Sequence, residues 1–279
     1  FLIFQKNYFT GQKYKISYYK KMKENHYINL DNFRKNNYSQ NGEDGIIKEL
    51  IKRLKLDKNP NDNWCVEFGA WDGIYLSNTY NLVKNGWKAI YIEGDIRKFK
   101  DLLKTKSNHE NIIAINKFVS KNIESKNSLD NILKKTNIPI NFEILSIDID
   151  SFDLEVWYSL TTYKPKIVII EINSAYPPGI IKWHSERNSN TNGNSFSATL
   201  KVAEEKGYRL LFHTGNMIFI KKELIDFIRI DPRFLRHPEL LYDDTWYSIE
   251  KNIFKKFFIR CSAFLKEKIN KKIKKLFLR

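Results

Sequence analysis

The sequence predicts an α/β fold whose mostly parallel, seven-stranded sheet ends in an antiparallel hairpin. Two observations lead to this prediction. Short apolar runs with strand composition alternate with amphipathic helical segments, the pattern of parallel strands joined by helical crossovers. The last two apolar runs are separated by only four residues, which close a hairpin but not a crossover. With 279 residues, 42% of them hydrophobic, the chain is large enough to bury such a sheet.

The alternation begins with a helix over residues 42–56, where apolar residues recur at helical spacing. A turn-forming cluster at 59–63 then leads into the first strand. A polar loop at 185–195 and one more helix precede the hairpin, whose antiparallel pair distinguishes this sheet from an ordinary dinucleotide-binding sheet. The predicted strands span residues 64–68, 89–93, 112–116, 142–149, 167–172, 208–212 and 217–221, and the helices between them lie at about 96–103, 128–135, 154–160 and 198–206.

The net charge of +16 belongs to the two ends of the chain and not to its body. Residues 1–38 hold 8 lysines and arginines against 2 acids, residues 251–279 hold 11 against 1, and residues 39–250 hold 29 of each. We therefore expect a basic N-terminal extension at 1–37, a domain at 38–225 and a C-terminal extension at 226–279. The neutral body offers no broad basic face, so nucleic-acid binding is not expected.

Cysteine usage and hydropathy indicate the cellular setting. The two cysteines, Cys65 and Cys261, exclude a disulfide scaffold and a cysteine-rich zinc site, and they favour a reducing, cytoplasmic compartment. No apolar run is long enough for a transmembrane helix. Residues 251–279 instead place large apolar residues on one face, with lysines filling most of the rest. They predict a basic amphipathic helix that lies on an anionic membrane surface, with packing on the domain or on a partner as alternatives.

Acidic residues stand at the ends of the first two predicted strands, at Glu67 and Glu93. Ligands of such sheets bind beyond the carboxyl ends of the strands, where glycine lets the backbone come close and an acid can hold a ribose. The loop after Glu67 matches neither of the common phosphate-binding patterns, GxGxxG and GxxxxGK[ST], and its acids suit an ammonium or a sulfonium better than a pyrophosphate. This loop reads Gly69-Ala70-Trp71-Asp72-Gly73.

A second set of polar residues follows the fourth and fifth predicted strands. Asp148 and Asp150 end the fourth strand, and Glu171 and Asn173 end the fifth. Within each pair the residues are two apart and share one face, and the two strands are neighbours in this fold. These groups either hold a hard cation such as Mg²⁺ or act without metal, with one carboxylate as general base on a hydroxyl. Asp153, one helical turn further on, is expected to cap its helix.

Five stretches of the sequence, in this order, resemble the FkbM-type branch of class I S-adenosylmethionine-dependent methyltransferases. The resemblance covers roughly residues 38–222 and implies a Rossmann-like fold whose sixth and seventh strands are the hairpin. The loop after the first strand departs from the commoner GxGxG form. The five stretches are YSQNGEDGII (38–47), VEFGAWDG (66–73), YIEGD (91–95), LSIDIDSFDLEVW (145–157) and IVIIEIN (167–173).

The resemblance also implies which residues serve the cofactor and the reaction. Ser39 and Gln40 belong to a lid over S-adenosylmethionine, Glu93 takes its ribose, and residues 116–119 flank its adenine. The reaction implied is O-methylation of a saccharide or another small hydroxylated acceptor. Carried over by position, the cofactor site comprises Gln40, Glu67, Gly69, Ala70, Asp72, Gly73, Glu93 and Asp148, and the catalytic residues are Asp150, Glu171 and Asn173.

Two other functions remain as alternatives. The acids of Asp148-Ile149-Asp150 at a strand end are typical of glycosyltransferases that bind Mn²⁺ and a sugar nucleotide. A membrane-tethered binding module with an inactive enzyme fold is the second alternative. In the loop after the fifth strand, Tyr176 and Trp183 either stack on the acceptor or close its pocket. His184 in that loop and His213 in the hairpin turn are interpreted as solvated loop residues rather than bases.

Overall fold

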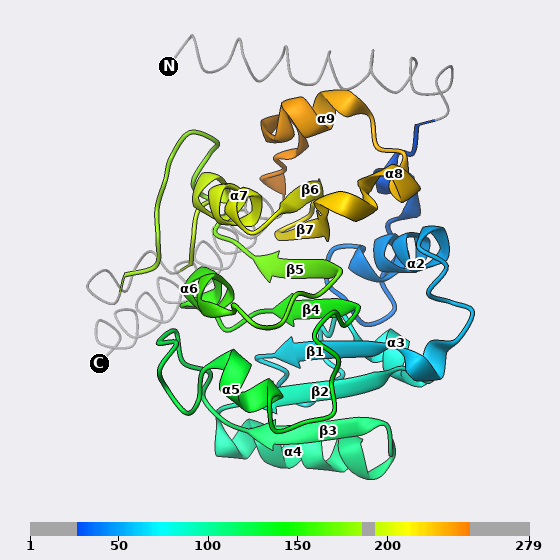
Figure 1. The fold of residues 1–279 in the computed structure, drawn as a ribbon, viewed down its shortest axis with the longest axis vertical. Helices are drawn as coiled ribbons and strands as arrows, with labels where there is room; N and C mark the ends of the chain where they lie inside the picture. Colours follow the sequence, from blue (N-terminus) through cyan, green and yellow to red (C-terminus); the bar gives the residue numbers. More distant parts are fainter. Residues whose placement is uncertain (1–26, 186–192, 246–279) are drawn as a thin grey trace, which may run out of the picture.

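The computed structural model describes residues 27–185 and 193–245. Its strands are β1 (Trp64–Phe68), β2 (Lys88–Glu93), β3 (Ile112–Asn116), β4 (Ile144–Ile147), β5 (Ile167–Glu171), β6 (Tyr208–His213) and β7 (Asn216–Lys221). They form one sheet in the order β3-β2-β1-β4-β5-β7-β6 (Figure 1). β1 to β5 run parallel, and β7 pairs antiparallel with β5 and with β6. The predicted fold class is therefore confirmed, including the terminal hairpin.

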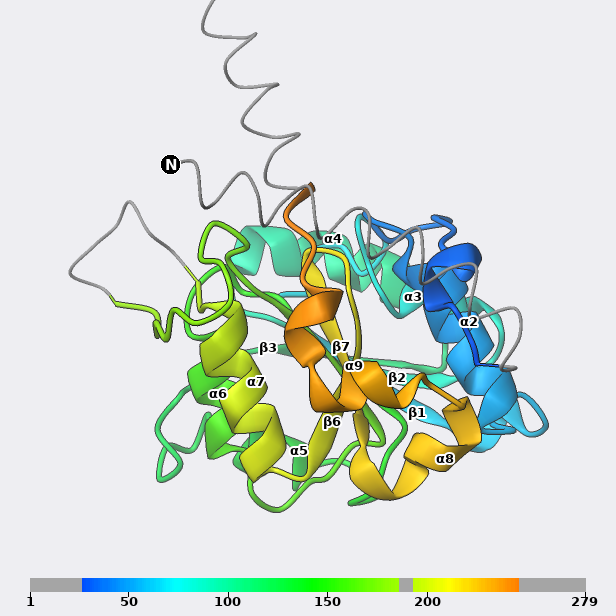
Figure 2. The same ribbon diagram turned by 90° about the horizontal axis from the view of Figure 1, so that it is seen from above.

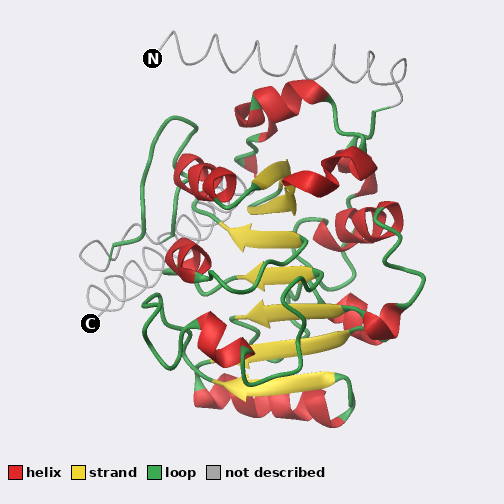
Figure 3. Cartoon of the chain, viewed as in Figure 1, coloured by secondary structure: helices red, strands yellow, loops and turns green. Residues whose placement is uncertain are grey.

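Helices cover both faces of the sheet (Figure 2). One face carries α2 (Glu43–Arg53), α3 (Tyr80–Lys84) and α4 (Ile96–Ser107), and the other carries α5 (Leu129–Leu133), α6 (Asp153–Ser159) and α7 (Phe196–Glu205). Helices and strands alternate as far as the hairpin, after which α8 (Ile225–Ile228) and α9 (Pro232–Arg236) follow (Figure 3). The short 3₁₀ segments of the described chain are η1 (Leu30–Phe33), η2 (Pro60–Asp62), η3 (Lys222–Leu224) and η4 (Pro238–Leu241).

Each face of the sheet has its own hydrophobic core, because successive side chains of a strand point to opposite faces. In β1, Val66 and Phe68 pack in the core with α5, α6 and α7, whereas Cys65 packs in the core with α2, α3 and α4. All four residues of β4, at the centre of the sheet, are buried. Burial on both faces explains why the central strands read as continuous apolar runs and not as alternating ones.

Polar side chains decide where several helices begin. The Asp95 carboxylate accepts hydrogen bonds from the backbone N–H groups of Arg97 and Lys98 at the start of α4. Ser128 and Ser195 cap α5 and α7 in the same manner. These caps satisfy backbone donors that have no partner within the helix, and each contributes about 1 kcal/mol to stability.

The observed elements differ from the predicted ones in two ways. The strand predicted at 142–149 is shorter, because the chain leaves the sheet at Asp148 and turns through Asp150, whose φ is +58°. Asp148 and Asp150 therefore lie in a turn and not on the strand. The sequence pattern does not predict α3, α8 or α9, since helices of 5, 4 and 5 residues are too short to show helical periodicity.

Described residues outside the predicted 38–225 domain pack against it. Leu30, before the domain, and Ile228, after it, are buried in the core that α2 forms with the sheet. Arg34 and Asp243 join the two flanking segments through an ion pair of 3.0 Å. Residues 27–37 and 226–245 therefore share the core of the domain. The predicted amphipathic helix at 251–279 lies outside the described residues, and within them no helix has the length and apolar character needed to cross a bilayer.

Replacement of Gly69 by alanine tests the approach of the β1 end to the β4 end. Gly69 has φ +79°, and a Cβ atom there would lie 1.6 Å from the Asp148 carbonyl oxygen. We expect Gly69→Ala to lower the free energy of unfolding by about 3 kcal/mol or more, because backbone strain adds to a clash that only movement of the main chain relieves. Urea denaturation measures this loss.

Gly207→Ala is the matched control for this substitution. Gly207 has φ +82°, but nothing lies within 4 Å of the position of its Cβ atom. The control therefore carries the backbone strain without the clash and should lose only about 1–2 kcal/mol. Equal losses in the two variants would show that the contact with Asp148 is unimportant for stability.

Candidate active site

The ends of four strands meet at one edge of the sheet. β2, β1, β4 and β5 are adjacent and parallel, so the residues that follow them lie side by side (Figure 1). Gly69 and Gly73, with φ of +79° and +76°, let the loop after β1 turn across this edge. A Cβ atom on Gly73 would lie 2.8 Å from Leu102 and 2.9 Å from Tyr91, so the loop rests directly on α4 and β2. We call this the carboxyl edge; ligands of open α/β sheets bind at such edges.

Glu67 lies buried beneath the loop after β1. Its carboxylate accepts hydrogen bonds from the hydroxyls of Ser77, at 2.8 Å, and Thr79, at 2.5 Å. Burial raises the pKa of Glu67 to about 7, against the lowering effect of the Thr79 and Ser77 hydrogen bonds. Glu67 thus supports the loop from below, and its predicted contact with the cofactor stays a prediction. The sequence pattern missed Ser77 and Thr79, because hydroxyls before a short helix look like ordinary caps.

Glu93 joins the loop after β1 to the end of β2. One carboxylate oxygen accepts a hydrogen bond from the Trp71 N–H at 2.9 Å, and the other accepts one from the Asp95 N–H at 2.7 Å. A carboxylate has about four acceptor positions, so these two bonds leave room for two hydroxyl donors. Glu93 stands at the end of β2, where the sequence predicts an acid that binds the ribose, and the contact with the ribose itself stays a prediction.

Ala70 and Asp72 shape the loop that contains them. The N–H groups of Gly69 and Ala70 both donate to the Ile92 carbonyl, at 3.1 and 3.2 Å, which ties the loop to β2. One Asp72 carboxylate oxygen accepts from the N–H groups of Ile74 and Tyr75, each at 2.8 Å. These hydrogen bonds fix the backbone of the loop. The predicted contacts of Ala70 and Asp72 with the cofactor stay predictions.

The segment that contains Ser39 and Gln40 is held by the first residues of α2. One Asp44 carboxylate oxygen accepts from three successive backbone N–H groups, including that of buried Ser39 at 2.8 Å, and the Ser39 hydroxyl accepts from the Asp44 N–H at 3.0 Å. Gln40 lies exposed at the tip of this segment. Glu43 accepts hydrogen bonds from Thr214 and Asn216 of the hairpin, so the predicted lid is anchored on both sides.

Segment 116–119, predicted to flank the adenine, lies against the end of β2. The Asn116 side-chain amide donates to the carbonyls of Glu93, at 2.8 Å, and Gly94, at 3.1 Å. The Lys117 N–H donates to the Glu93 carbonyl at 3.2 Å. The structure therefore brings this segment beside the proposed ribose acid, as the prediction requires.

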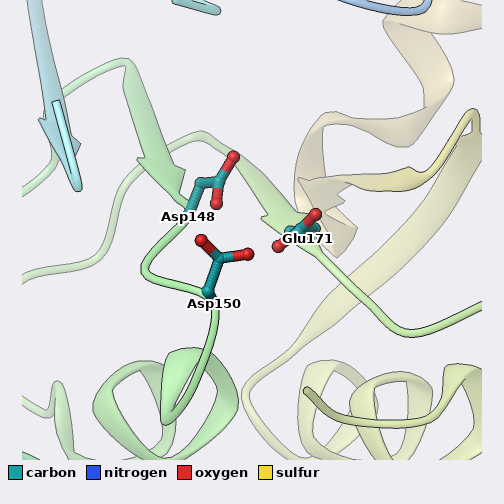
Figure 4. Close-up of side chains that lie close together, drawn as sticks. All are labelled: Asp148, Asp150 and Glu171. Carbon is teal, nitrogen blue, oxygen red and sulfur yellow. The ribbon is translucent and has the colours of Figure 1, made fainter. Parts of the chain in front are cut away.

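Three carboxylates gather beyond β4 and β5. Asp148, Asp150 and Glu171 each offer an oxygen, and these oxygens lie within 4.8 Å of one another. Figure 4 shows Asp148 leaving the end of β4, Asp150 in the turn after it, and Glu171 at the end of β5 with its carboxylate near the other two. We call these residues the carboxylate cluster. The sequence predicted this meeting, although a turn and not a strand positions Asp150.

Two members of this cluster, Asp148 and Glu171, have raised pKa values. The pKa of Asp148 is raised to about 6. The largest cause is loss of hydration, although solvent reaches part of the side chain, and the next cause is the negative charge of Asp150. Glu171 has its pKa raised well above the usual range, first by burial and then by the charge of Asp148. A hydrogen bond between Asp148 and Glu171 lowers the pKa of the former and raises that of the latter.

Asp153 and Asn173 stabilise local turns. The Asp153 carboxylate accepts from the N–H groups of Ile149, at 2.7 Å, and Ser151, at 2.9 Å, and burial raises its pKa to about 7. It therefore holds the turn that carries Asp150. The prediction that Asp153 caps its helix is wrong, because α6 begins at Asp153 and the carboxylate accepts from residues before the helix. The Asn173 side-chain oxygen accepts from the Ala175 N–H at 2.9 Å and so shapes the start of the loop after β5. Its predicted catalytic role stays a prediction.

The two loop histidines differ in their surroundings. The prediction that His213 is solvated is wrong: it is 1% exposed, its Nδ1 accepts from the Asp243 N–H at 2.9 Å, and its ring stacks on Tyr242. Residues after the hairpin cover it, which the hairpin sequence alone does not reveal. His184 is half-buried, and its Nδ1 accepts from the Gly193 N–H at 3.2 Å. Neither histidine is placed as a base of the carboxylate cluster by these contacts.

Two aromatic residues of the loop after β5 have local partners. Lys182 donates to the Tyr176 hydroxyl at 2.7 Å, and the Trp183 ring contacts the ring of Tyr158 edge to face at a centroid distance of 5.9 Å. Trp183 is 37% exposed, so it is available to an acceptor. Whether these rings stack on an acceptor or close its pocket stays a prediction.

A cavity of about 320 Å³ lies away from this edge, between Tyr27 and the residues of α8 and α9. Its lining is largely apolar, with Ile225, Ile230 and Leu235 among its residues, and none of the acids described above borders it. The size of a cavity does not make it a reaction site. The convergence of titratable groups at the carboxyl edge is the stronger indication of chemistry.

Comparison with known proteins returns fold-level similarity only. No protein-family model matches the sequence, and neither does any curated protein. Similar solved structures include a Staphylococcus aureus protein assigned as a caffeoyl-CoA O-methyltransferase (TM-score 0.39, 14% identity, 62% of this chain and 83% of that one). A SAM-dependent methyltransferase from Aquifex aeolicus has a TM-score of 0.36 and 12% identity, over 61% of this chain and 86% of that one.

The CurJ carbon methyltransferase has a TM-score of 0.41 and 9% identity, over 63% of this chain and 52% of that one. All of these scores are low, so the fold class rests on the observed strand order and not on the neighbours. Membership of the FkbM-type branch stays a prediction. The conclusion at this point is that the chain has the seven-stranded α/β fold with a terminal antiparallel hairpin that the sequence predicts.

The raised pKa of Glu67 predicts a pH dependence of stability. A carboxyl group whose pKa is about 7 when folded and near 4.5 when unfolded binds more protons in the folded state between these values. The free energy of unfolding therefore falls as pH rises from about 4.5 to 7, by up to about 3 kcal/mol from this group. Glu67→Gln removes that contribution, so its unfolding free energy should fall less between pH 5 and pH 8, as measured by urea denaturation at both values.

Glu124→Gln, on an exposed loop, is the control and should leave the pH dependence as it is in the wild type. The pKa values of Asp148 and Asp153 are raised as well, so the unfolding free energy of Glu67→Gln still falls as the pH rises, but by a smaller amount than in the wild type. If the unfolding free energies of the wild type and Glu67→Gln fell by the same amount between pH 5 and pH 8, the raised pKa of Glu67 would be contradicted.

Proposed function

We propose that this chain is an S-adenosylmethionine-dependent methyltransferase that acts on a hydroxyl of a saccharide or another small hydroxylated acceptor. The observation that carries the proposal is the carboxyl edge. A glycine-containing loop lies between the acids of β1 and β2 there, and the carboxylate cluster stands beside it. An edge lined by acids suits a cationic sulfonium ligand. The observed fold class is consistent with this assignment.

The cofactor, when bound, supplies a methyl group on a positively charged sulfur. Glu93 accepts the ribose hydroxyls with the acceptor positions that its two backbone bonds leave open. Gly69 and Gly73 let the backbone of the loop approach the methionine end. Asp148 places negative charge near the sulfur, and Gln40, exposed on the anchored segment before α2, contributes to the lid.

The carboxylate cluster removes the proton of the acceptor. Asp148 and Asp150 are both exposed, but Asp148 is engaged in a hydrogen bond with Glu171. Asp150 would therefore take the hydroxyl proton of the acceptor, whose oxygen would receive the methyl group that S-adenosylmethionine supplies. The hydrogen bond between Glu171 and Asp148 keeps the Asp148 carboxylate in place. Asn173 positions the loop after β5, on which the acceptor rests.

Binding of S-adenosylhomocysteine tests the assignment of the cofactor. Isothermal titration of the full chain should show binding in the micromolar range and no response to sugar nucleotides, whereas the reverse would favour the glycosyltransferase alternative. Glu93→Gln should weaken this binding roughly 10- to 100-fold, because charge-assisted hydrogen bonds to the ribose are lost. Asp101→Asn, exposed on α4 and paired with Lys104, is the control and should bind as the wild type does.

Asp150→Asn tests the base. Methyl transfer from S-adenosylmethionine to the best substrate of a saccharide panel should fall about 10²- to 10⁴-fold, because the amide cannot accept the proton. Binding of S-adenosylhomocysteine should change little. A variant with normal kcat would exclude Asp150 as the base, and unchanged activity in both Asp150→Asn and Glu93→Gln would support a function that does not depend on this site.

The carboxylate cluster also provides the oxygen ligands that Mg²⁺ prefers, which is the alternative to a metal-free base. The Mg²⁺ site and the metal-free base are distinguished by the melting temperature of EDTA-treated protein, measured with and without added Mg²⁺. A metal site predicts a rise that Asp150→Asn abolishes, since the ion neutralises adjacent carboxylates. A metal-free site predicts equal melting temperatures, and methyl transfer that EDTA leaves unchanged.

We also propose a location, which rests on the sequence of residues 251–279. The basic amphipathic helix predicted there would hold a cytoplasmic enzyme at an anionic membrane face, with a glycan or small-molecule acceptor and no nucleic-acid partner. Flotation with anionic liposomes compares the full chain with a 1–250 truncation. If the full chain floats and the truncation does not, this location is supported. If both float equally, residues 251–279 have no role in membrane binding.

A further inference from the structure

Trp71 has a glycine-like backbone in the middle of the loop after β1. Gly69, Trp71 and Gly73 occupy alternate positions of this loop, and their φ angles are +79°, +46° and +76°. All three therefore lie in the left-handed region. A tryptophan rarely adopts this conformation, because its Cβ atom crowds the backbone carbonyl. A glycine at position 71 would fit the same backbone without strain.

Burial explains only part of why a large side chain occupies this position. Trp71 is 43% exposed, so a large part of the hydrophobic gain that a fully buried indole provides is absent. Strained residues of this kind cluster at functional sites, where the strained geometry serves binding or catalysis. Trp71, Leu76 and Asp150 make up three of the five non-glycine residues with positive φ in the described chain, and all three lie in loops that leave the carboxyl ends of β1 and β4.

The indole is nevertheless held in one place. The Lys98 ammonium lies 4.6 Å from the centre of its ring, and the Tyr75 ring meets it edge to face at 5.6 Å. The backbone N–H of Trp71, not the indole N–H, donates to the Glu93 carboxylate at 2.9 Å and fixes the main chain from which the ring extends. An exposed ring that neighbouring groups keep in position is ready to receive a ligand without a further loss of conformational freedom.

A second exposed ring stands at the same end of β2. Phe118 is 73% exposed, and its ring covers Gly94 so closely that a Cβ atom there would lie 2.3 Å from it. Glu93, the proposed ribose acid, thus has the Trp71 backbone bound to its carboxylate and Phe118 over the next residue. Flat aromatic surfaces next to a ribose acid suit a nucleoside, since bases stack on aromatic rings.

We propose that the Trp71 indole is a wall of the binding site for the nucleoside part of S-adenosylmethionine, held by Lys98 and Tyr75. This inference rests on the proposed function and adds to it a residue that determines cofactor affinity. The ring occupies the glycine-like position because contact with the nucleoside offsets the strain of the backbone. The loop then binds the cofactor with a side chain at a point where a glycine would leave only backbone.

Trp71→Gly and Trp71→Phe test this role by titration with S-adenosylhomocysteine. Trp71→Gly keeps the backbone N–H that bonds to Glu93 and relieves the strain, so its melting temperature should stay close to that of the wild type. Its dissociation constant should rise roughly tenfold, as loss of a stacked aromatic predicts. Trp71→Phe keeps a ring and should bind within about threefold of the wild type.

Tryptophan fluorescence provides the second readout, with Trp64→Phe as the matched control. Trp64 also has a lysine over its ring, with the Lys88 ammonium 5.4 Å away, but it begins β1 at the opposite edge of the sheet. S-adenosylhomocysteine should quench wild type and Trp64→Phe, and it should quench Trp71→Phe much less. If the Trp71 variants bind S-adenosylhomocysteine with wild-type affinity and are quenched as the wild type is, this inference is overturned and the proposed function stands. If the wild type does not bind S-adenosylhomocysteine, both the proposed function and this inference are overturned.

Discussion

The contact between Gly69 and the Asp148 carbonyl is the constraint on which the rest of the carboxyl edge depends. β1 and β4 are neighbours at the centre of the sheet, and the Asp148 N–H continues their pairing by donating to the Phe68 carbonyl at 3.2 Å. The chain after β1 must turn at once, and no side chain fits at the turn. This one close approach places the loop that carries Trp71 beside the turn that carries Asp150.

The concentration of acids at this edge lowers the stability of the domain at neutral pH. Glu67, Asp148, Asp153 and Glu171 all have raised pKa values, and loss of hydration is the largest cause for each. A protein selected for stability alone would avoid this arrangement, because apolar residues at the same places would cost nothing to bury. Such a concentration of perturbed acids is typical of a site that binds a cation or moves a proton. A sulfonium ligand would relieve part of the repulsion, so ligand binding and folding should be coupled at this edge.

The segment before α2 is tied to the far end of the chain. Glu43, which is fully buried, accepts hydrogen bonds from Thr214 and Asn216, and Asn216 is paired with Glu171 in the sheet. Glu43 also adds to the negative charge that raises the pKa of Asp148. The segment proposed as a lid is therefore connected to the carboxylate cluster through a single buried carboxylate. On the C-terminal side of Gln40 the chain is thus fixed at the start of α2.

The amino-acid sequence alone determined the architecture of this protein, because the pattern of apolar residues reflects burial on both faces of each central strand. It also placed the acids, since a carboxylate at the end of an apolar strand is visible in the sequence. Only the tertiary structure decided how these residues act. Whether Glu67 faces a ligand or lies beneath the loop depends on Ser77 and Thr79, and the burial of His213 depends on residues that follow the hairpin.

The position of Trp71 shows the same division. A reading of residues 69–73 reveals that a tryptophan stands where a glycine is commoner, but not whether the backbone keeps its left-handed turn. Gly69 lies against the Asp148 carbonyl and Gly73 against Tyr91, so the loop is closely packed on both sides of Trp71. These neighbours come from segments distant in sequence, and between them Trp71 has a conformation that its own local preferences disfavour. The sequence thus determined which residues lie at the carboxyl edge, and tertiary packing decided which of them are buried beneath the loop and which are exposed at its surface.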